Sequence, residues 1–487
     1  MNTITLTIHG GARIRVPHSL DQITPYVLLE QEDWFEDEIR FVRLCLQPGM
    51  HAVDIGANFG VYTLAMAQAV GAQGSVQAFE PTPDTAALLR ASLEDNGARH
   101  VRVHELAVSD RTGSAHLSLH EQPELNALGE DVRGIQVQTV SLDELSSQQQ
   151  WPPIDFVKID AEGHEPQVVA GGARLFREQS PLVMFEIKAG DRVDFTAAER
   201  FSELGYFPYY LLPGPMMLVP FNPRQPADPF LLNLFCCKPD RAEALARRGL
   251  LAPRPAPCDV SARAAQAAWT KYQRGTAYAP ALSLAWPRGP NWFTKADMKT
   301  YLEALYLYAW SHVGEVDTGQ RLGLLLNALS RVAEARATRD TLPRLVTQAR
   351  LSWELGRRAE AIGALRLAGQ RVDAEAGSIR REPFLPPLPR YEQVRPGKAP
   401  ELWLKCAIAE ASEKLGAFSS MFTGTNSLPV LESIGALPAR SPEMERRRQL
   451  VRMRAQMQVG PQPHPLLAAQ NDENLNSQFW CTPAKAA

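Results

Sequence analysis

Several features that would place this 487-residue chain in a familiar class are missing from it. No apolar run approaches the roughly 18 residues of a transmembrane helix, and the first residues, MNTITLTIHGGARIRV, lack the apolar core of a signal peptide. Neither sign of charge is in excess, since 51 Lys and Arg residues stand against 54 Asp and Glu residues. That balance argues against a nucleic-acid-binding surface. We therefore expect a cytoplasmic protein that neither spans a membrane nor binds nucleic acid.

Cysteine is also scarce, and its spacing fits neither a zinc site nor a disulfide framework. The six cysteines are Cys45, Cys236, Cys237, Cys258, Cys406 and Cys481. The adjacent pair Cys236 and Cys237 falls within an apolar predicted strand, where small buried side chains are the ordinary interpretation. The chain is thus expected in a reducing compartment.

The dinucleotide-binding fingerprint G-x-G-x-x-G is absent, and a different glycine turn is present. Residues 51–67, HAVDIGANFGVYTLAMA, predict a buried strand, a turn that contains Gly56 and Gly60, and a helix that opens near Tyr62 and Thr63. Glycines are needed where the backbone approaches a ligand or adopts dihedrals that a Cβ forbids. The next predicted strand ends at Glu80, where a doubly wound fold places a ribose-binding carboxylate.

The missing fingerprint separates the candidate cofactors. A pyrophosphate needs the phosphate-binding glycines, so their absence argues against a nicotinamide-dependent oxidoreductase. S-adenosylmethionine carries an ammonium and a sulfonium group and no phosphate. An acidic turn, with Asp54 two residues before Gly56 and with Asn58 inside it, suits that cofactor. The turn therefore predicts a site for S-adenosylmethionine.

Strands and helices alternate up to about residue 247, which predicts a mostly parallel sheet with helices on both faces. The expected strands are residues 52–55, 76–79, 101–108, 154–159, 182–187, 207–212 and 231–237. Residues 114–120 and 135–142 alternate instead like an antiparallel pair. Residues 84–96 and 166–178 are expected to be helices. Residues 207–229, although rich in Pro and Gly, are interpreted as an irregular strand pair at the sheet edge.

After a proline-rich stretch near residues 249–259 the pattern becomes helical. We expect three parts: residues 1–250, a helical domain over residues 260–459, and a poorly ordered tail over residues 460–487. Residues 349–368 resemble a tetratricopeptide-type helical pair with Gly356 at its turn, although no fixed period is present. We predict few contacts across the proline-rich stretch, so that residues 1–250 fold alone. The cluster of Arg446, Arg447, Arg448, Arg452 and Arg454 is interpreted as a solvated helix face.

A second group of candidate residues follows the strand of residues 154–159. Asp160, Glu162, His164 and Glu165 crowd one loop at the end of that strand, and Glu186 ends the next strand. In a doubly wound sheet both ends open beside the cofactor cleft. His164 or a carboxylate could act as a general base on a substrate hydroxyl. Alternatively, Asp160, Glu162 and Glu186 could hold a divalent cation such as Mg²⁺, which prefers oxygen ligands. The spacing leaves both roles open.

The ordered set of motifs resembles the FkbM family of S-adenosylmethionine-dependent methyltransferases. The similarity covers about residues 26–245 and comprises WFEDEIRF, VDIGANFGVYT, FEP, LAVSD, TVSLDEL, VKIDAEGHE and FEIK. It implies an α/β class I methyltransferase fold, a doubly wound sheet of seven strands with the last antiparallel, followed here by an all-α domain. It further implies O-methylation of saccharides or natural products.

By that resemblance, a defined set of residues surrounds the cofactor and another carries the chemistry. Glu80 would bind the ribose, Ala107 would face the adenine, and Asp160, Glu162 and His164 fall in the family's acidic loop. The methionine end of the cofactor would be surrounded by Asp54, Gly56, Asn58, Gly60, Tyr62 and Thr63.

Two hypotheses of different classes follow. In the first, the protein is a methyltransferase for a small-molecule or glycan acceptor, and its helical domain binds that acceptor or a protein partner. In the second, it is a catalytically silent scaffold that keeps the cofactor fold and acts through its helices. The intact acidic loop, from Asp160 to Glu165, favours the enzyme.

Overall fold

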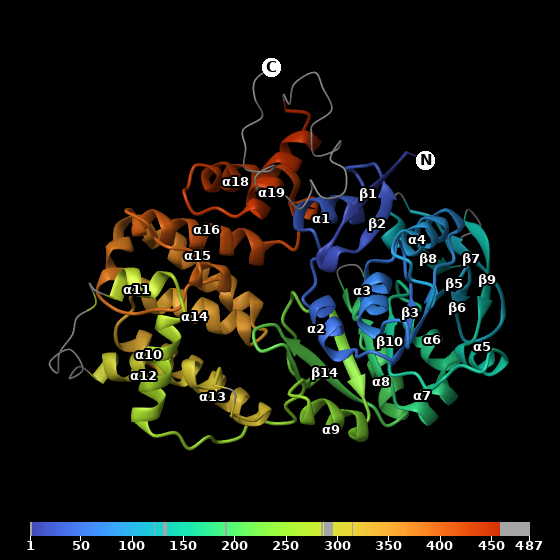
Figure 1. Ribbon diagram of the computed structural model, residues 1–487, viewed down its shortest axis with the longest axis horizontal. Coiled ribbons are helices and arrows are strands. Elements are labelled where there is room, and N and C mark those ends of the chain that lie inside the picture. Colours follow the sequence, from blue (N-terminus) through green and yellow to red (C-terminus); the bar gives the residue numbers. More distant parts are fainter. Residues whose placement is uncertain are drawn as a thin grey trace.

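The computed structural model describes residues 2–120, 122–129, 134–189, 192–283, 286, 296–313 and 315–457. The predicted tail of residues 460–487, with Cys481, lies outside the described residues. Figure 1 shows two parts side by side, a sheet with its covering helices and an all-helical part.

An eight-stranded mixed sheet forms the core of the first part. Its strands lie in the order β15 (Met217–Pro220), β14 (Phe207–Leu212), β16 (Asn233–Cys237), β11 (Leu182–Glu186), β10 (Phe156–Ile159), β3 (His51–Ile55), β4 (Ser75–Phe79) and β5 (Val101–His104). The five strands from β11 to β5 are parallel, and β16 is antiparallel to both of its neighbours. The predicted class I methyltransferase sheet of seven strands is confirmed. The strand β15 extends it at one edge by pairing with β14, as the expected edge pair.

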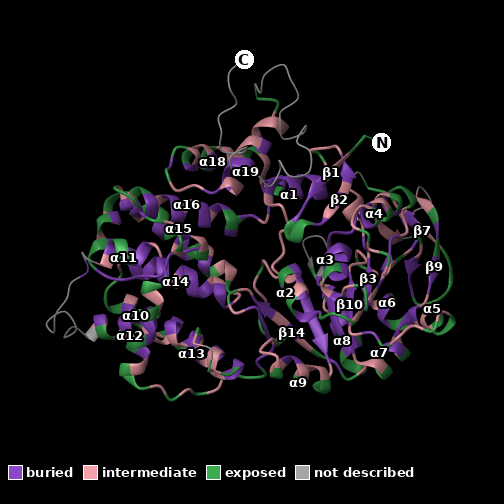
Figure 2. Ribbon diagram, viewed as in Figure 1, coloured by how far each residue is buried: buried purple, intermediate pink, exposed green. Residues whose placement is uncertain are grey.

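Side chains of the central strands alternate between two hydrophobic cores, because successive residues of a strand point to opposite faces. Ala52 and Cys237 pack on one face, and Val53 and Cys236 pack on the other. The first face is covered by α2 (Glu38–Cys45), α3 (Val61–Val70), α4 (Pro83–Asp95) and α9 (Pro239–Arg247). The second is covered by α5 (Leu142–Gln148), α6 (Glu165–Gly171), α7 (Ala173–Gln179) and α8 (Thr196–Glu203). Figure 2 shows the resulting buried interior.

One predicted strand is divided between two sheets. The chain leaves the main sheet after His104, and β6 (Ala107–Val108) instead pairs with β9 (Ile135–Val140). The prediction of one continuous strand over residues 101–108 was therefore wrong. The same small sheet holds β7 (Gly113–Ser118), antiparallel to β9, and β8 (Ala127–Gly129), which confirms the predicted antiparallel pair. The helix expected over residues 166–178 is likewise broken, at Gly172, into α6 and α7.

Shorter elements lie outside the main sheet. A hairpin of β1 (Thr3–Thr7) and β2 (Arg13–Pro17) precedes α1 (Ile23–Gln31). The Arg15 guanidinium forms two hydrogen bonds with Asp95 of α4, each 2.7 Å long. A second short pair is formed by β12 (Lys188–Ala189) and β13 (Arg192–Val193).

Beyond residue 260 all secondary-structure elements among the described residues are helices. The α-helices are α10 (Ala262–Arg274), α11 (Tyr278–Ser283), α12 (Ala296–Ser311), α13 (Thr318–Thr338), α14 (Leu342–Glu354), α15 (Arg358–Glu375), α16 (Pro400–Gly416), α17 (Ser420–Thr423), α18 (Leu428–Gly435) and α19 (Pro442–Arg454). The predicted pair around Gly356 is present as α14 and α15, with Gly356 at φ +70° in the turn. Tetratricopeptide character stays a prediction.

The expectation that few contacts cross between the two parts is wrong. Leu212 and Met217 of the sheet edge share one hydrophobic core with helices α10, α12 and α13. The proline-rich stretch is itself attached to the sheet, because the Leu218 and Ala252 amides donate to the carbonyls of Leu250 and Leu218 (2.8 and 2.9 Å). The boundaries near residues 250 and 260 stay predictions, but Leu212, Met217 and Val219 of the edge strands are buried against the helices.

The arginine cluster is a second correction. Arg447 is 0% exposed, and its guanidinium lies 3.2 Å from Glu30 of α1, which is also 0% exposed. Arg446 donates to the Glu30 carbonyl (2.7 Å) and pairs with Glu32. These contacts fasten α19 to α1, which lie together in Figure 1. Only Arg452 and Arg454, on the same helix, keep a substantial exposed fraction.

Candidate functional site

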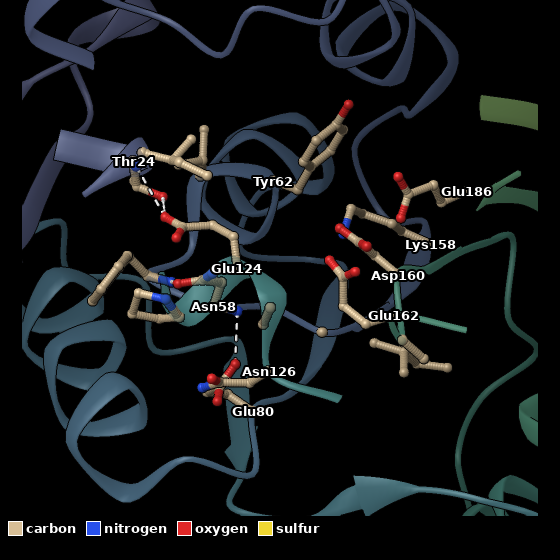
Figure 3. A pocket seen from close by; sticks show the side chains of 18 of the residues that line it. Thr24, Asn58, Tyr62, Glu80, Glu124, Asn126, Lys158, Asp160, Glu162 and Glu186 are labelled. Carbon is tan, nitrogen blue, oxygen red and sulfur yellow. Dashed lines mark hydrogen bonds and ion pairs between the residues drawn. The ribbon is translucent and has the colours of Figure 1, made fainter. Parts of the chain in front are cut away.

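A cavity of about 600 Å³ lies at the carboxyl ends of the parallel strands. Nine of the predicted residues line it: Gly56, Asn58, Gly60, Tyr62, Glu80, Ala107, Asp160, Glu162 and Glu186. Figure 3 shows six of their side chains around the cavity: Asn58, Tyr62, Glu80, Asp160, Glu162 and Glu186. This is where an open α/β sheet binds its ligands. The sequence therefore located the cavity.

The turn after β3 is shaped by its glycines. Gly56 has φ +73°, and a Cβ on it would lie 1.9 Å from the Asp160 carbonyl oxygen. Gly60 has φ +98°, and a Cβ there would lie 2.4 Å from the Leu89 side chain. Only glycine fits both positions, because each combines a positive φ with a close neighbour. The turn can thus pass next to the end of β10 and leave backbone facing the cavity.

Glu80, at the end of β4, holds that turn in place. Its carboxylate accepts hydrogen bonds from the backbone amides of Asn58 (3.0 Å) and Thr82 (2.8 Å). Burial raises the pKa of Glu80, although these amides oppose the shift. Each carboxylate oxygen keeps further acceptor capacity toward the cavity. The glycine turn and Glu80 are therefore in direct contact, as expected.

Asp54 and Thr63 lie behind the turn and do not line the cavity. The Thr63 hydroxyl donates to the Asp54 carboxylate (2.5 Å), and both side chains are fully buried. Asp54 also lies 3.8 Å from the ammonium of Lys158. Burial raises the pKa of Asp54, and the charge of Lys158 opposes that rise. Asp54 is therefore connected to the cavity through its ion pair with Lys158, which does line the cavity.

Three carboxyl groups gather on the β10–β11 side of the cavity. Oxygen atoms of Asp160, Glu162 and Glu186 lie within 4.8 Å of one another. Burial and the charge of Asp160 raise the pKa of Glu162 to about 8 and that of Glu186 to about 10. Two negative charges at such short range repel each other, so protons or a cation must reduce the charge. We call these three residues the carboxylate cluster.

Lys158 and Glu36 belong to the same region and were not predicted. The Lys158 ammonium lies 2.9 Å from Asp160 and 5.1 Å from the centre of the Tyr62 ring. Burial alone would lower the pKa of Lys158, but the charges of Asp160 and Asp54 raise it. The Tyr62 hydroxyl donates to Glu36 (2.6 Å), whose pKa is raised by burial. A lysine inside the apolar strand VKI was a visible sequence signal, whereas Glu36 is one acid among several in its segment.

His164 faces away from the carboxylate cluster. It is the residue before α6, it does not line the cavity, and its Nε2 lies 2.9 Å from the Ser109 hydroxyl. Burial lowers the pKa of His164. Glu165 accepts hydrogen bonds from the amides of Ala161 and Gly163 and thereby braces the loop. The structure thus brings the carboxylates of the predicted set together and separates His164 from them.

Aromatic side chains from distant segments form the remaining side of the cavity. Phe35 follows α1, Phe230 precedes β16, and Phe418 and Phe422 belong to the helical part. We call these four residues the aromatic wall. The Phe35 ring centre lies 5.3 Å from that of Phe418 and 5.8 Å from that of Phe422. The site is therefore completed by the helical part of the chain.

Comparison with known proteins agrees with this architecture. Residues 54–208 match the family model described as "Methyltransferase FkbM domain". Solved structures similar to the chain include the methyltransferase FkbM from Methylobacillus flagellatus, with 15% identity and a TM-score of 0.27 over 41% of this chain and 50% of that one. No curated protein matches the sequence.

Two further solved structures are similar to part of the chain. An O-methyltransferase from Bacillus cereus, in complex with S-adenosylhomocysteine, has 16% identity and a TM-score of 0.27 over 44% of this chain and 86% of that one. A SAM-dependent methyltransferase from Aquifex aeolicus has 11% identity and a TM-score of 0.27 over 44% and 93%.

The sheet order and the cavity at its carboxyl edge define a class I methyltransferase fold, the fold of enzymes that use S-adenosylmethionine. Within that class, residues 54–208 are a methyltransferase domain of the FkbM kind, as the motifs predicted. The helical part lies outside the matched residues. Among the described residues, no helix is long and apolar enough to cross a membrane.

Proposed function

We propose that the protein transfers the methyl group of S-adenosylmethionine to a hydroxyl oxygen of a saccharide or natural-product acceptor. The observation that carries the proposal is the carboxylate cluster beside the glycine turn, with its oxygens within 4.8 Å of one another. Such a cluster can remove the proton of a hydroxyl, or hold the cation that acidifies it. A methyltransferase for hydroxyl groups needs one of these.

The residues of the glycine turn fit the cofactor. Gly56 and Gly60 leave the backbone open to the cavity, and Glu80 presents carboxylate oxygens suited to two ribose hydroxyls. Ala107 lies on the same cavity and supplies a small surface for the adenine ring. Asn58 and Tyr62 line the part between the turn and the carboxylate cluster. The cofactor itself supplies an electrophilic methyl group, and these side chains orient it.

The carboxylate cluster then acts on the acceptor hydroxyl. The Lys158 ammonium lies 2.9 Å from the Asp160 carboxylate and holds it in place. The ionised form of Glu162 can take the hydroxyl proton, because its pKa, raised to about 8, makes it a stronger base than an ordinary carboxylate. Glu186, whose pKa is raised to about 10, holds its own proton near neutral pH and can donate it in a hydrogen bond. With Mg²⁺ bound, the same three residues would instead be its ligands. His164, away from the cavity, positions the loop through Ser109.

Manganese titration separates the two roles, because Mn²⁺ binds the oxygen sites of Mg²⁺. In electron paramagnetic resonance, a cation site predicts one bound Mn²⁺ per chain that is lost in Asp160→Asn and Glu186→Gln and kept in the exposed control Glu178→Gln. Full methyl transfer in excess chelator would instead establish the base role. Wild-type rates of S-adenosylhomocysteine formation in both cluster variants would show that the carboxylate cluster is structural and overturn the proposal.

The alternative is a scaffold that binds the cofactor without turnover. The carboxylate cluster argues against a scaffold, because three carboxyl groups at this spacing destabilise the folded state. Such a cluster is expected where it binds a ligand or takes part in a reaction. S-adenosylhomocysteine binding without any S-adenosylhomocysteine formation, tested with small-molecule and glycan extracts, would favour the scaffold. We further propose that the protein acts in the cytoplasm and that its helical part binds a protein partner.

A further inference from the structure

The aromatic wall is assembled from segments far apart in the sequence. Phe418 and Phe422 lie at the end of α16 and in α17, whereas Phe35 lies between α1 and α2. Phe230 joins them with its ring centre 6.2 Å from that of Phe418. All four line the same cavity as the carboxylate cluster. A cavity wall of phenylalanines offers apolar, flat surface and no hydrogen-bonding group.

The part of the wall around Phe418 is held in place by polar contacts. The Phe418 carbonyl accepts hydrogen bonds from Gln31 (2.6 Å) and from the Arg447 guanidinium (3.2 Å). Two residues on, the Ser420 amide donates to the Glu30 carboxylate (3.0 Å). The Arg358 guanidinium lies 4.0 Å from the centre of the Phe418 ring. A surface fixed in this way is preorganised for a ligand, which lowers the ordering cost of binding.

Phe422 stands at the rim of the cavity. Its side chain is 53% exposed, although large apolar side chains usually bury such area. It contacts the rest of the wall through the Phe35 ring, nearly at a right angle. The wall therefore runs from the interior to the solvent, so that a ligand can enter along it.

The polar groups of the same region lie near the ends of β11 and β16. Asn233 faces Glu186 in the strand register, lines the cavity and is 5% exposed. Its amide nitrogen is buried and has no hydrogen-bond partner among the described residues. Asn233 interacts with the Glu36 carboxyl as a hydrogen-bonding side chain and lowers its pKa, but their contact falls short of hydrogen-bond geometry, so the amide can still donate to a ligand. A buried donor without a partner is uncommon and marks a place for a ligand acceptor group.

We propose that the acceptor is a planar aromatic ring that carries a hydroxyl, which stacks on Phe418 and Phe422 and presents its hydroxyl oxygen to the Asn233 amide. The inference rests on the proposed methyl transfer and names its substrate class. A saccharide has hydroxyls all around its ring and would bury several against phenylalanines without partners. An aromatic ring with its hydroxyl at one end matches a flat apolar wall and a polar inner end.

The test is a calorimetric titration of the full chain, loaded with S-adenosylhomocysteine, with neutral catechol and with methyl β-glucopyranoside. We expect catechol to bind and the glucoside not to bind. Phe418→Ala, Phe422→Ala and Asn233→Ala should each weaken catechol binding about tenfold or more. Phe207→Ala is the matched control, because Phe207 is 54% exposed and does not line the cavity. It should bind catechol as the wild type does.

Circular dichroism and S-adenosylhomocysteine affinity should be unchanged in all four variants. Tighter binding of the glucoside, absence of catechol binding, or equal catechol affinity in the wall variants and the wild type would each overturn the inference. Failure of the proposed function has a different result, because the chain would then form no S-adenosylhomocysteine from S-adenosylmethionine with any hydroxylated acceptor.

Discussion

The buried pair of Glu30 and Arg447 should be a main connection between the helical part and the sheet, and Arg447→Met tests it. Both side chains are 0% exposed, and Arg447 also lies within 3.5 Å of Glu413 and Glu443. The substitution leaves buried carboxylates without their cation. Removal of one partner from a buried pair costs about 3–5 kcal/mol, whereas loss of a surface pair costs about 0–1 kcal/mol.

Urea unfolding, followed by tryptophan fluorescence and by circular dichroism, measures this cost. Arg331→Met is the control, because Arg331 pairs with Glu334 at the exposed surface. We expect Arg447→Met to lose about 3–5 kcal/mol and Arg331→Met less than about 1 kcal/mol. The double variant Glu30→Gln, Arg447→Met should recover part of the loss, since fewer unpaired charges then remain. Equal losses in Arg447→Met and Arg331→Met would refute the reasoning.

Two further predictions concern the carboxylate cluster and the division of the chain. The pKa of Glu186 is raised from 4.5 to about 10, so the folded protein favours the protonated form of this side chain. Its contribution to the free energy of unfolding is complete below about pH 4.5 and is lost as the pH rises toward 10. Glu186→Gln stays neutral, so without divalent cations its melting temperature should exceed that of the wild type by more at pH 9 than at pH 6, and a constant difference would contradict this. A chain that ends at Arg248 would expose Leu212 and Met217 of the shared core. We expect it to aggregate on size-exclusion chromatography, and a soluble monomer with wild-type affinity for S-adenosylhomocysteine would show that the first part folds alone.

Local features of the fold and the site could be predicted from the sequence. The strand, glycine turn and helix around Gly56 are encoded within a few residues, because the turn needs positive φ angles that glycine supplies. Glu80 and Asp160 follow apolar strands, and parallel strands bring their carboxyl ends to one edge of the sheet. The alternation of strands and helices along the chain likewise predicted a sheet covered on both faces.

Contacts between distant segments could not be predicted in the same way. The role of Phe418 depends on Phe35, and that of Ser420 on Glu30, which is 390 residues away. An arginine cluster is ordinarily solvated because burial of a charge is costly. The burial of Arg447 is offset by three carboxylates, those of Glu30, Glu413 and Glu443, and the first of these comes from the other end of the chain. The position of His164 depends on the loop conformation after β10, which its sequence does not specify.

We propose that the cavity at the glycine turn binds the methyl donor and that Glu80 binds its ribose. Calorimetric titration of S-adenosylhomocysteine into the wild type and Glu80→Ala tests it directly, with Glu105→Ala as the exposed control. Loss of charged hydrogen bonds worth about 2–3 kcal/mol predicts affinity about 30–150-fold weaker in Glu80→Ala and unchanged in Glu105→Ala. Absence of binding to the wild type, or wild-type affinity in a folded Glu80→Ala, would contradict the claim.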